Sequence, residues 1–260
     1  MNNKLTAEHI FPFGLISKFP EYKYAFLGEK KAVKLSPKKQ VIKDVCQNCN
    51  NGALSKLDSY GNKFIMDYFS RNLSPEQIVT IRYDYQILLK WVMKILFNSL
   101  RKNDSSSWLK KNSKYMIGKV EKTTSEVSLF LGTYVDLAPF QNMFPSLPFQ
   151  GISEPKILLS SRAFHKEILE YRNENIEIIY VLRLCNAIFL LVCWKENRWN
   201  SKEEEALNGL IPHTLLTPNN NTGKIARSTD SFNCEHLYLV SSKKAQFEHD
   251  IYMKMIVRKK

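Results

Sequence analysis

Two short stretches near the N-terminus carry residue types that could hydrolyse a phosphodiester bond. In the first, a short apolar run that ends at a proline, Glu8 stands beside His9. The second is a CxxC turn, formed by Cys46 and Cys49, that continues directly into Asn50. An acid, an imidazole and an amide are the groups that a phosphodiesterase with one metal ion needs.

The chemistry sets clear demands on these groups. Hydrolysis requires a deprotonated water in line with the leaving oxygen and positive charge near the phosphorane that develops. A neutral imidazole, with a pKa of about 6.5, is a suitable base for that water. A hard divalent cation held by carboxylate and amide oxygens would neutralise the phosphate. Glu8 and His9 are neighbours on an extended chain, so both reach one site only where the strand bends.

The order of these residues resembles the HNH endonucleases, also called His-Me finger or ββα-metal nucleases. The matching runs are Leu5-Thr6-Ala7-Glu8-His9-Ile10-Phe11-Pro12 and Val45-Cys46-Gln47-Asn48-Cys49-Asn50-Asn51-Gly52. The family pattern is an acid-histidine pair followed by an apolar residue and proline, then a variable loop, then C-x-x-C-[HN] opening a helix. The match covers residues 1–70. It implies a β-hairpin packed on a helix, with one catalytic metal ion between them.

The resemblance implies a role for each matching residue. His9 matches the general base that activates water, and Glu8 matches the acidic metal ligand, which is more often Asp in the family. Asn50 matches the last metal ligand, at the start of the helix, and Asn51 is the alternative if the register slips by one. The implied catalytic cofactor is Mg²⁺ or Mn²⁺.

The chain departs from the family pattern around its cysteines. Many members carry a second C-x-x-C before the acid-histidine pair, and four thiolates then hold a structural zinc ion. Here Cys46 and Cys49 supply at most half of such a site. Either distant residues complete it or the thiols pack without metal, and we favour a chain without Zn²⁺. The family's middle asparagine or histidine has no clear equivalent either, Gln40 being the nearest amide.

The net charge of +13 indicates a polyanionic partner, either nucleic acid or an acidic membrane surface. Between the two motifs, residues 18–43 read as a basic, loop-like insertion with interleaved aromatics, which suits a phosphate backbone and exposed bases. The alternative is a solvated hairpin or loop whose aromatics turn inward. The candidate nucleic-acid contacts are Lys30, Lys31, Lys34, Lys38, Lys39 and Lys43.

Hydrophobic periodicity predicts the elements that must position these residues. Residues 5–12 and 41–45 read as strands, and residues 51–69 as a helix with a break near Gly61. A second helix, residues 83–100, has a wide apolar stripe. Its basic residues read as a solvated face: Lys90, Lys94, Arg101 and Lys102.

Beyond residue 104 the periodicity favours strands. They are expected at residues 126–135, 156–160 and 176–194, the last with a hairpin turn at Cys185-Asn186, and a short acidic helix is expected at residues 202–210. The predicted fold class is therefore α+β. An N-terminal ββα-metal (HNH) module is followed by helices and then by a mixed α+β C-terminal region.

We expect three segments in this fold. Residues 1–70 form the HNH nuclease module and residues 71–103 a helical buttress. Residues 104–260 form an α+β region for substrate selection, dimerisation or partner docking.

The sequence also bears on the cellular compartment of the protein. No apolar run approaches the roughly 20 residues of a membrane span, and the N-terminus lacks the apolar region of a signal peptide. We therefore expect a cytoplasmic protein without a membrane partner. Five cysteines, an odd number, do not read as a disulfide framework.

The predicted function is that of a metal-dependent endonuclease, with DNA favoured over RNA. The family also suggests a place in a restriction or anti-phage defence system, as a homodimer or with a partner protein. Two alternatives stay open. One is a catalytically inactive HNH scaffold that binds nucleic acid, and the other is a subunit whose nuclease is silent until a partner arrives.

Overall fold

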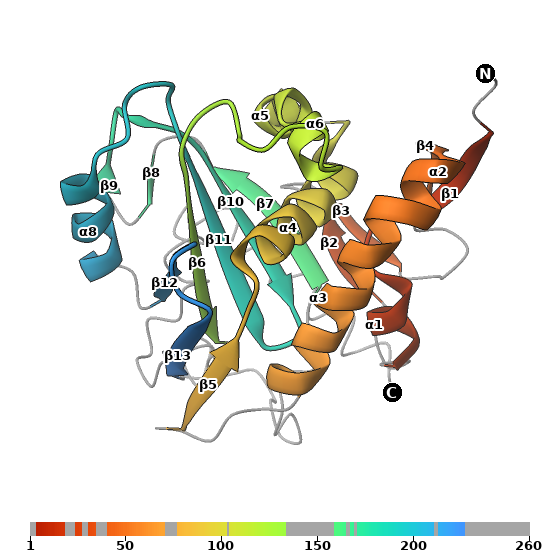
Figure 1. Ribbon diagram of the computed structural model, residues 1–260, viewed down its shortest axis with the longest axis horizontal. Coiled ribbons are helices and arrows are strands. Elements are labelled where there is room, and N and C mark those ends of the chain that lie inside the picture. Colours follow the sequence, from red (N-terminus) through yellow and green to blue (C-terminus); the bar gives the residue numbers. More distant parts are fainter. Residues whose placement is uncertain are drawn as a thin grey trace, which may run out of the picture.

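The computed structural model describes residues 4–18, 24–27, 31–34, 41–70, 77–102, 104–133, 159–164, 167–168, 171–210 and 213–226. These residues form an α+β fold, as the sequence predicts, with helices packed on a seven-stranded sheet (Figure 1). The helices are α1 (Phe13–Lys18), α2 (Gln47–Cys49), α3 (Ser55–Tyr68), α4 (Tyr85–Leu100), α5 (Ser107–Lys111), α6 (Ser113–Met116) and α8 (Ser201–Leu210). A π-helical turn (Asn50–Leu54) joins α2 to α3, and a 3₁₀ turn (Asp104–Ser106) precedes α5.

The strands form one large sheet and three small pairs. Their bounds are β1 (Leu5–His9), β2 (Tyr24–Leu27), β3 (Lys31–Lys34), β4 (Val41–Cys46), β5 (Ile78–Arg82), β6 (Val127–Thr133), β7 (Leu159–Phe164), β8 (Glu167–Ile168), β9 (Tyr171–Arg172), β10 (Ile176–Leu184), β11 (Ala187–Trp194), β12 (Thr214–Leu216) and β13 (Thr222–Ala226). The large sheet has the order β12-β6-β11-β10-β7-β2-β3, and β1–β4, β5–β13 and β8–β9 pair separately. Neighbours in the large sheet run antiparallel except β2 and β7, which run parallel.

The predicted hairpin forms the centre of this sheet. β10 and β11 pair from Ile176 to the turn, where Leu184 lies opposite Ala187, and Cys185 takes a positive φ of 54°. Every residue of β11 is buried. A strand without a solvent-facing side requires cover on both faces of the sheet.

Alternate residues of the hairpin enter two different cores. One face packs against α3, α4, α5 and α6, which lie across the sheet in Figure 1. It includes Ile178, Tyr180, Leu182, Phe189, Leu191 and Cys193. The other face packs with Leu207 of α8 and includes Ile179, Val181, Ile188, Leu190, Val192 and Trp194. The hairpin therefore holds both layers together.

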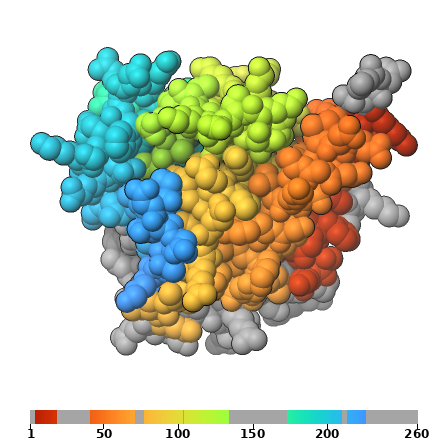
Figure 2. Space-filling view, in the orientation of Figure 1, coloured from red at the N-terminus to blue at the C-terminus, as the bar shows by residue number. Residues whose placement is uncertain are grey.

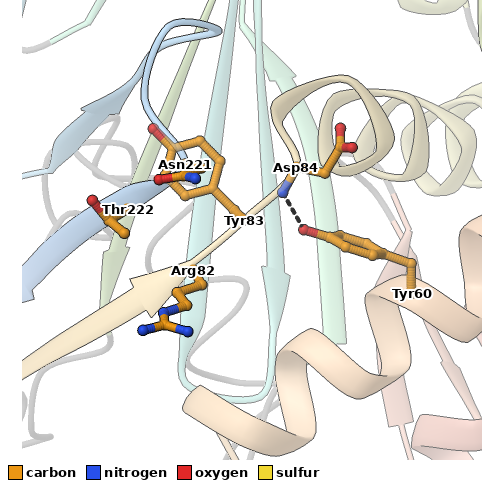
Figure 3. Close-up of a pocket in the computed structure, with 6 residues that line it drawn as sticks. All are labelled: Tyr60, Arg82, Tyr83, Asp84, Asn221 and Thr222. Carbon is orange, nitrogen blue, oxygen red and sulfur yellow. Dashed lines mark hydrogen bonds between the residues drawn. The ribbon is translucent and has the colours of Figure 1, made fainter.

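The helix predicted at residues 83–100 is confirmed as α4. The Asp84 carboxylate accepts a hydrogen bond from the Ile87 N–H at 3.0 Å, which caps the first turn. The Asp84 N–H donates in turn to the Tyr60 hydroxyl of α3 at 2.6 Å, as Figure 3 shows beside the pocket that these residues line. The start of α4 is thereby fixed to the middle of α3.

The expected break near Gly61 is wrong, because α3 continues through it. A β-carbon at Gly61 would lie 1.9 Å from Cε2 of Trp91, which is fully buried in α4. The glycine is therefore needed for the close approach of two helices rather than for a kink.

Gly61→Ala is expected to lower the free energy of unfolding by about 1–3 kcal/mol, since the rigid indole has no room to retreat. Gly52→Ala is the control, because a β-carbon there meets nothing within 4 Å. It should be neutral or stabilising by up to about 1 kcal/mol. Urea unfolding followed by circular dichroism measures both, and equal midpoints for the two variants would contradict the packing described here.

Aromatic contacts connect the three segments expected from the sequence. The Phe189 ring of β11 lies 6.4 Å from the Phe64 ring of α3 and 6.2 Å from the Trp91 ring of α4. The boundaries at residues 70 and 103 stay a prediction.

The described part of the segment 18–43 contains two paired strands, which agrees with the hairpin alternative rather than with a loop-like insertion. β2 and β3 form an antiparallel hairpin at the edge of the large sheet, with Tyr24 opposite Lys34. The alternating aromatics Tyr22, Tyr24 and Phe26 have the period of a strand, which accounts for the hairpin. In the part of the chain that is described, no helix has the length and apolar character needed to cross a bilayer.

Candidate functional site

The two sequence motifs meet at a pair of strands beside a helix. β1 and β4 pair antiparallel, with Thr6 opposite Val45 and His9 opposite Val41. The register shifts between Thr6 and Glu8, so the strand is irregular at the point where the acid-histidine pair begins. A register shift of this kind bends and twists a strand locally.

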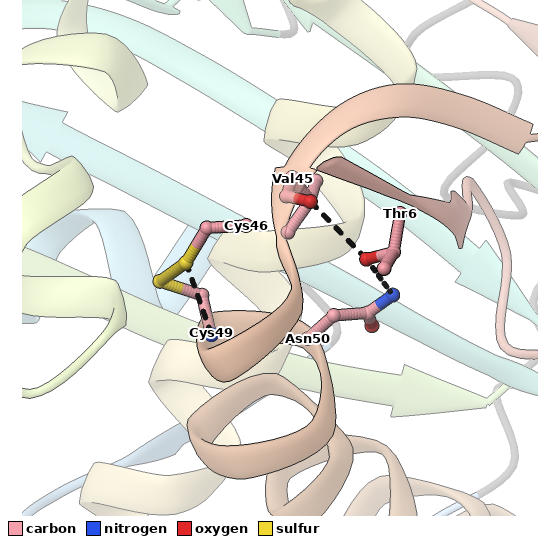
Figure 4. Close-up of a disulfide and its surroundings, with 5 residues drawn as sticks. All are labelled: Thr6, Val45, Cys46, Cys49 and Asn50. Atoms are coloured by element: carbon pink, nitrogen blue, oxygen red, sulfur yellow. Dashed lines mark hydrogen bonds between the residues drawn. A yellow bond between two sulfur atoms is a disulfide. The ribbon is translucent and has the colours of Figure 1, made fainter. Parts of the chain in front are cut away.

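Asn50 ties the start of the helix to β1 (Figure 4). Its side-chain Nδ2 donates to the Thr6 hydroxyl and to the Ala7 carbonyl, each at 3.0 Å. The Ala7 carbonyl belongs to the peptide that precedes Glu8. Asn50 thus positions the strand that carries the acid, and its assignment as a cation ligand stays a prediction. Asn51, the alternative, is exposed on the next residue of the π-helical turn.

Glu8 lies in a buried ionic cluster with α4 and α3. Its carboxylate, only 5% exposed, contacts the ammonium of Lys94, and the same ammonium donates to Asp58 Oδ2 at 2.6 Å. Asp58 Oδ1 accepts from Trp91 Nε1 at 3.2 Å. Burial raises the pKa of the Glu8 carboxyl, and the charge of Lys94 offsets part of that rise.

The expectation that Lys94 belongs to a solvated face is wrong, since Lys94 is 3% exposed. Lys94, Asn98 and Arg101 lie on one side of α4 because they are four and three residues apart. Asn98 Nδ2 donates to the His9 carbonyl at 3.3 Å, and Arg101 pairs with Asp44 of β4 at 2.8 Å. This polar stripe of α4 therefore holds the β1–β4 pair.

His9 lies on the outer side of the same strand. Its imidazole is half-buried and packs against the Phe13 ring of α1, with 5.2 Å between ring centroids. The structure thus brings His9, Glu8 and Asn50 together on adjoining elements. It directs the Glu8 carboxylate inward to α4 and leaves the imidazole partly open to solvent.

Two residues of this cluster, Asp58 and Lys94, were not assigned to the site from the sequence. Asp58 stands beside Leu57 and four residues after Leu54, among the residues that α3 buries. An acidic residue on the buried face of a helix requires a partner, so the position of Asp58 in the apolar pattern could have indicated its role from the sequence. Its partner, a lysine on a different helix, could not.

The oxygen donors here are of the type that Mg²⁺ or Mn²⁺ prefers, although the ammonium of Lys94 contacts both carboxylates. Mg²⁺ in proteins is typically bound through one or two carboxylates, with substrate phosphate and water completing its ligands. Glu8 and Asp58 are two carboxylates that already converge on one positive charge, that of Lys94. Among the described residues, no group of three His, Cys, Asp or Glu side chains is placed to hold a metal ion. A metal ion bound by Glu8 and Asp58 would share both carboxylates with the ammonium of Lys94.

Cys46 and Cys49 are joined by a disulfide (Figure 4), a bond that the cysteine count had not suggested. The Cys49 N–H donates to Sγ of Cys46 at 3.1 Å, which caps the first helical turn and brings the two Cα atoms to 5.3 Å. This bridge closes one turn of helix rather than linking distant parts of the chain. Zinc binds thiolates, so these cysteines could be zinc ligands only in their reduced form. The expectation of a chain without Zn²⁺ stays a prediction.

The predicted nucleic-acid contacts are only partly described. Lys43 is exposed on β4, and Lys31 and Lys34 lie on β3, although their side chains are outside the described part of the chain. The remaining three are not among the described residues: Lys30, Lys38 and Lys39. Their role stays a prediction.

Comparisons of the chain with protein-family models, with curated proteins and with solved structures found no match.

Proposed function

We propose that the protein is a metal-dependent endonuclease that hydrolyses phosphodiester bonds in nucleic acid, with DNA favoured. One observation carries the proposal. Asn50, at the start of a helix, donates to the carbonyl of Ala7 on the strand that carries Glu8 and His9, and Lys94 of α4 joins the Glu8 carboxylate to that of Asp58 on α3. An imidazole, two carboxylates and an amide thus lie on adjoining elements, with the Glu8 carboxylate turned inward to Lys94 and the imidazole on the outer side of β1.

The role of His9 follows from its exposure. A half-buried imidazole with one unprotonated nitrogen can accept the proton of a water molecule that attacks phosphorus. The new P–O bond forms as the bond to the leaving ribose oxygen breaks, and that oxygen takes up a proton. Asn98 donates a hydrogen bond to the His9 carbonyl, and Asn50 donates one to the Ala7 carbonyl two residues earlier. These two contacts fix the backbone that carries the imidazole.

Glu8 and Asp58 would hold the catalytic cation, with Asn50 or Asn51 as a further oxygen ligand. When bound, Mg²⁺ or Mn²⁺ supplies positive charge to the phosphate. Exposed lysines near these elements support a polyanionic substrate: Lys4 precedes β1, Lys43 lies on β4 and Lys56 begins α3.

The direct test is cleavage of supercoiled plasmid by purified protein in Mg²⁺ and in Mn²⁺, with excess EDTA as the control. A matched RNA of the same length decides between DNA and RNA. We expect nicked or linear DNA with metal and intact DNA with EDTA. Intact plasmid at high enzyme with every metal, or nicking that continues in EDTA, would reject a metal-dependent nuclease.

A second candidate is a catalytically inactive HNH scaffold that binds nucleic acid. The observation that favours it is the position of Lys94, whose ammonium already contacts both the Glu8 and the Asp58 carboxylate. Tight DNA binding without cleavage would select it. Cleavage that begins only when a co-encoded protein is added would select the partner-activated subunit of a defence complex, and a chain that cuts both strands would favour a homodimer.

A further inference from the structure

A groove at the N-terminal end of α4 is separate from the β1 site. The start of α4, the loop 121–127, the turn 196–199 and the end of β12 line it. These segments meet on the face shown in Figure 2. The cavity volume is about 930 Å³, which lies within the range of about 300–1,000 Å³ for small-molecule sites. Lys94 lies about 14 Å farther along α4, at about 1.5 Å per residue.

This groove is acidic although the chain carries a net charge of +13. Its charged side chains are Glu121, Lys122, Glu126, Glu196 and Glu204. Four carboxylates thus outnumber one ammonium among the described residues that line it. The local field attracts cations and disfavours the phosphates that the rest of the surface attracts.

The Glu204 carboxylate of the groove is held by a buried residue of the sheet. The Ser128 hydroxyl of β6 donates to Glu204 Oε1, and the same hydroxyl accepts from the indole N–H of Trp194 at 2.8 Å. Trp194 and Ser128 are both buried. A carboxylate held by such a chain loses little freedom when a ligand binds, so less free energy is spent on ordering it.

The loop that forms one rim is also held in place. The buried Asn112 accepts from the Thr124 N–H at 2.7 Å and donates to the Thr124 hydroxyl at 3.0 Å. The Trp108 indole donates to the Ser125 hydroxyl at 2.9 Å. These contacts give the groove a preformed wall.

Tyr85 brings a polar group to this groove that pairs with none of the described residues. The residue is 9% exposed and lines the cavity, yet its hydroxyl makes no hydrogen bond to any residue that the structure describes. Burial raises its pKa, and the carboxylates of Glu204 and Glu126 lie close enough to raise it further. Its hydroxyl thus has hydrogen-bonding capacity that a ligand in the groove could use.

Trp199 adds an aromatic surface at the rim. Its side chain is 42% exposed, which is unusual for so large an apolar group, and it lines the cavity together with Glu196. An indole face beside carboxylates attracts an organic cation both by its quadrupole and by its apolar area.

We propose that this groove binds an organic cation, a guanidinium or ammonium group carried on an apolar stem, either as a small molecule or as a basic side chain of a peptide. Glu126 and Glu204 pair with the charge, the Tyr85 hydroxyl completes its hydrogen bonds, and Trp199 covers the stem. This site does not depend on the nuclease assignment.

The test uses the full chain and Nα-acetyl-arginine amide (arginine amide) as the probe, with Nα-acetyl-citrulline amide (citrulline amide) as its uncharged analogue. Intrinsic tryptophan fluorescence, compared between the natural chain and Trp199→Phe, and isothermal titration calorimetry follow binding. We expect saturable binding of arginine amide and none of citrulline amide. Glu126→Gln combined with Glu204→Gln, and separately Tyr85→Phe, should each weaken binding at least about tenfold, because a hydrogen bond to a charged group is lost. Glu205→Gln, on the exposed side of α8, should leave affinity unchanged.

A second arm compares arginine amide with a capped pentapeptide that has arginine at its centre and alanine elsewhere. Tighter binding of the peptide assigns the site to a polypeptide, and equal affinity assigns it to a small cation. Equal binding of both amides, unchanged affinity in the double variant, or no saturable binding of any probe at millimolar concentration would overturn the proposal. Circular dichroism confirms that each variant is folded.

Discussion

Replacing Lys94 with methionine is expected to lower the free energy of unfolding by about 3–5 kcal/mol. The ammonium is 3% exposed and is the only described cation that contacts Glu8 and Asp58. Its loss leaves the buried Glu8 carboxylate without its partner and close to the half-buried carboxylate of Asp58. Methionine retains the length of the side chain, so the effect reports the charge rather than a cavity. Urea unfolding at neutral pH measures it.

Lys90→Met is the matched control on the same helix. Its ammonium lies 4.9 Å from the centroid of the Tyr115 ring and is partly solvated, so the change should stay within about 1 kcal/mol. If Glu8 and Asp58 also bind divalent cations, Mg²⁺ or Mn²⁺ should stabilise Lys94→Met more than the natural chain, since the competing ammonium is gone. A variant as stable as the natural chain would mean that the cluster is not ionic in solution.

His9→Ala is expected to reduce the rate of phosphodiester cleavage by about 10²–10⁴-fold, the usual contribution of a general base. Because His9 is half-buried and packs mainly on Phe13, the substitution should leave the fold intact. The rate is measured under single-turnover conditions, with enzyme in excess over labelled DNA, so that binding and product release do not enter.

Two measurements separate this effect from others. DNA affinity, followed by fluorescence anisotropy, should be equal in His9→Ala and the natural chain, because the imidazole acts on water rather than on DNA. Asn48→Ala, an exposed residue beside the disulfide, should cut at the natural rate. Equal rates in His9→Ala and the natural chain would remove His9 from the mechanism.

Local patterns predicted the elements that depend on local sequence. The period of apolar residues located α4, and two apolar halves around Cys185-Asn186 located the central hairpin. The strands β1 and β4 were expected at nearly their observed positions. In each case the signal and the structure occupy the same few residues, so periodicity was sufficient.

Periodicity failed where partners are distant in the chain. Lys94 was expected to face solvent because it is a lysine, although α4 places it against Glu8. Asp58, which contacts the same ammonium, was given no role. The pairing of β5 with β13, which joins Val79 to Ile225, was missed for the same reason. A buried ion pair is defined by two residues together, and neither one reveals it alone.

The most direct test of the proposed nuclease is chemical rescue of His9→Gly by free imidazole. The substitution removes the base and leaves a space beside the partly exposed strand. We predict that the cleavage rate of His9→Gly rises with imidazole concentration, whereas the natural chain does not respond. His9→Gly that cuts at the natural rate without imidazole would contradict the assignment of His9 as the base, and with it the central claim.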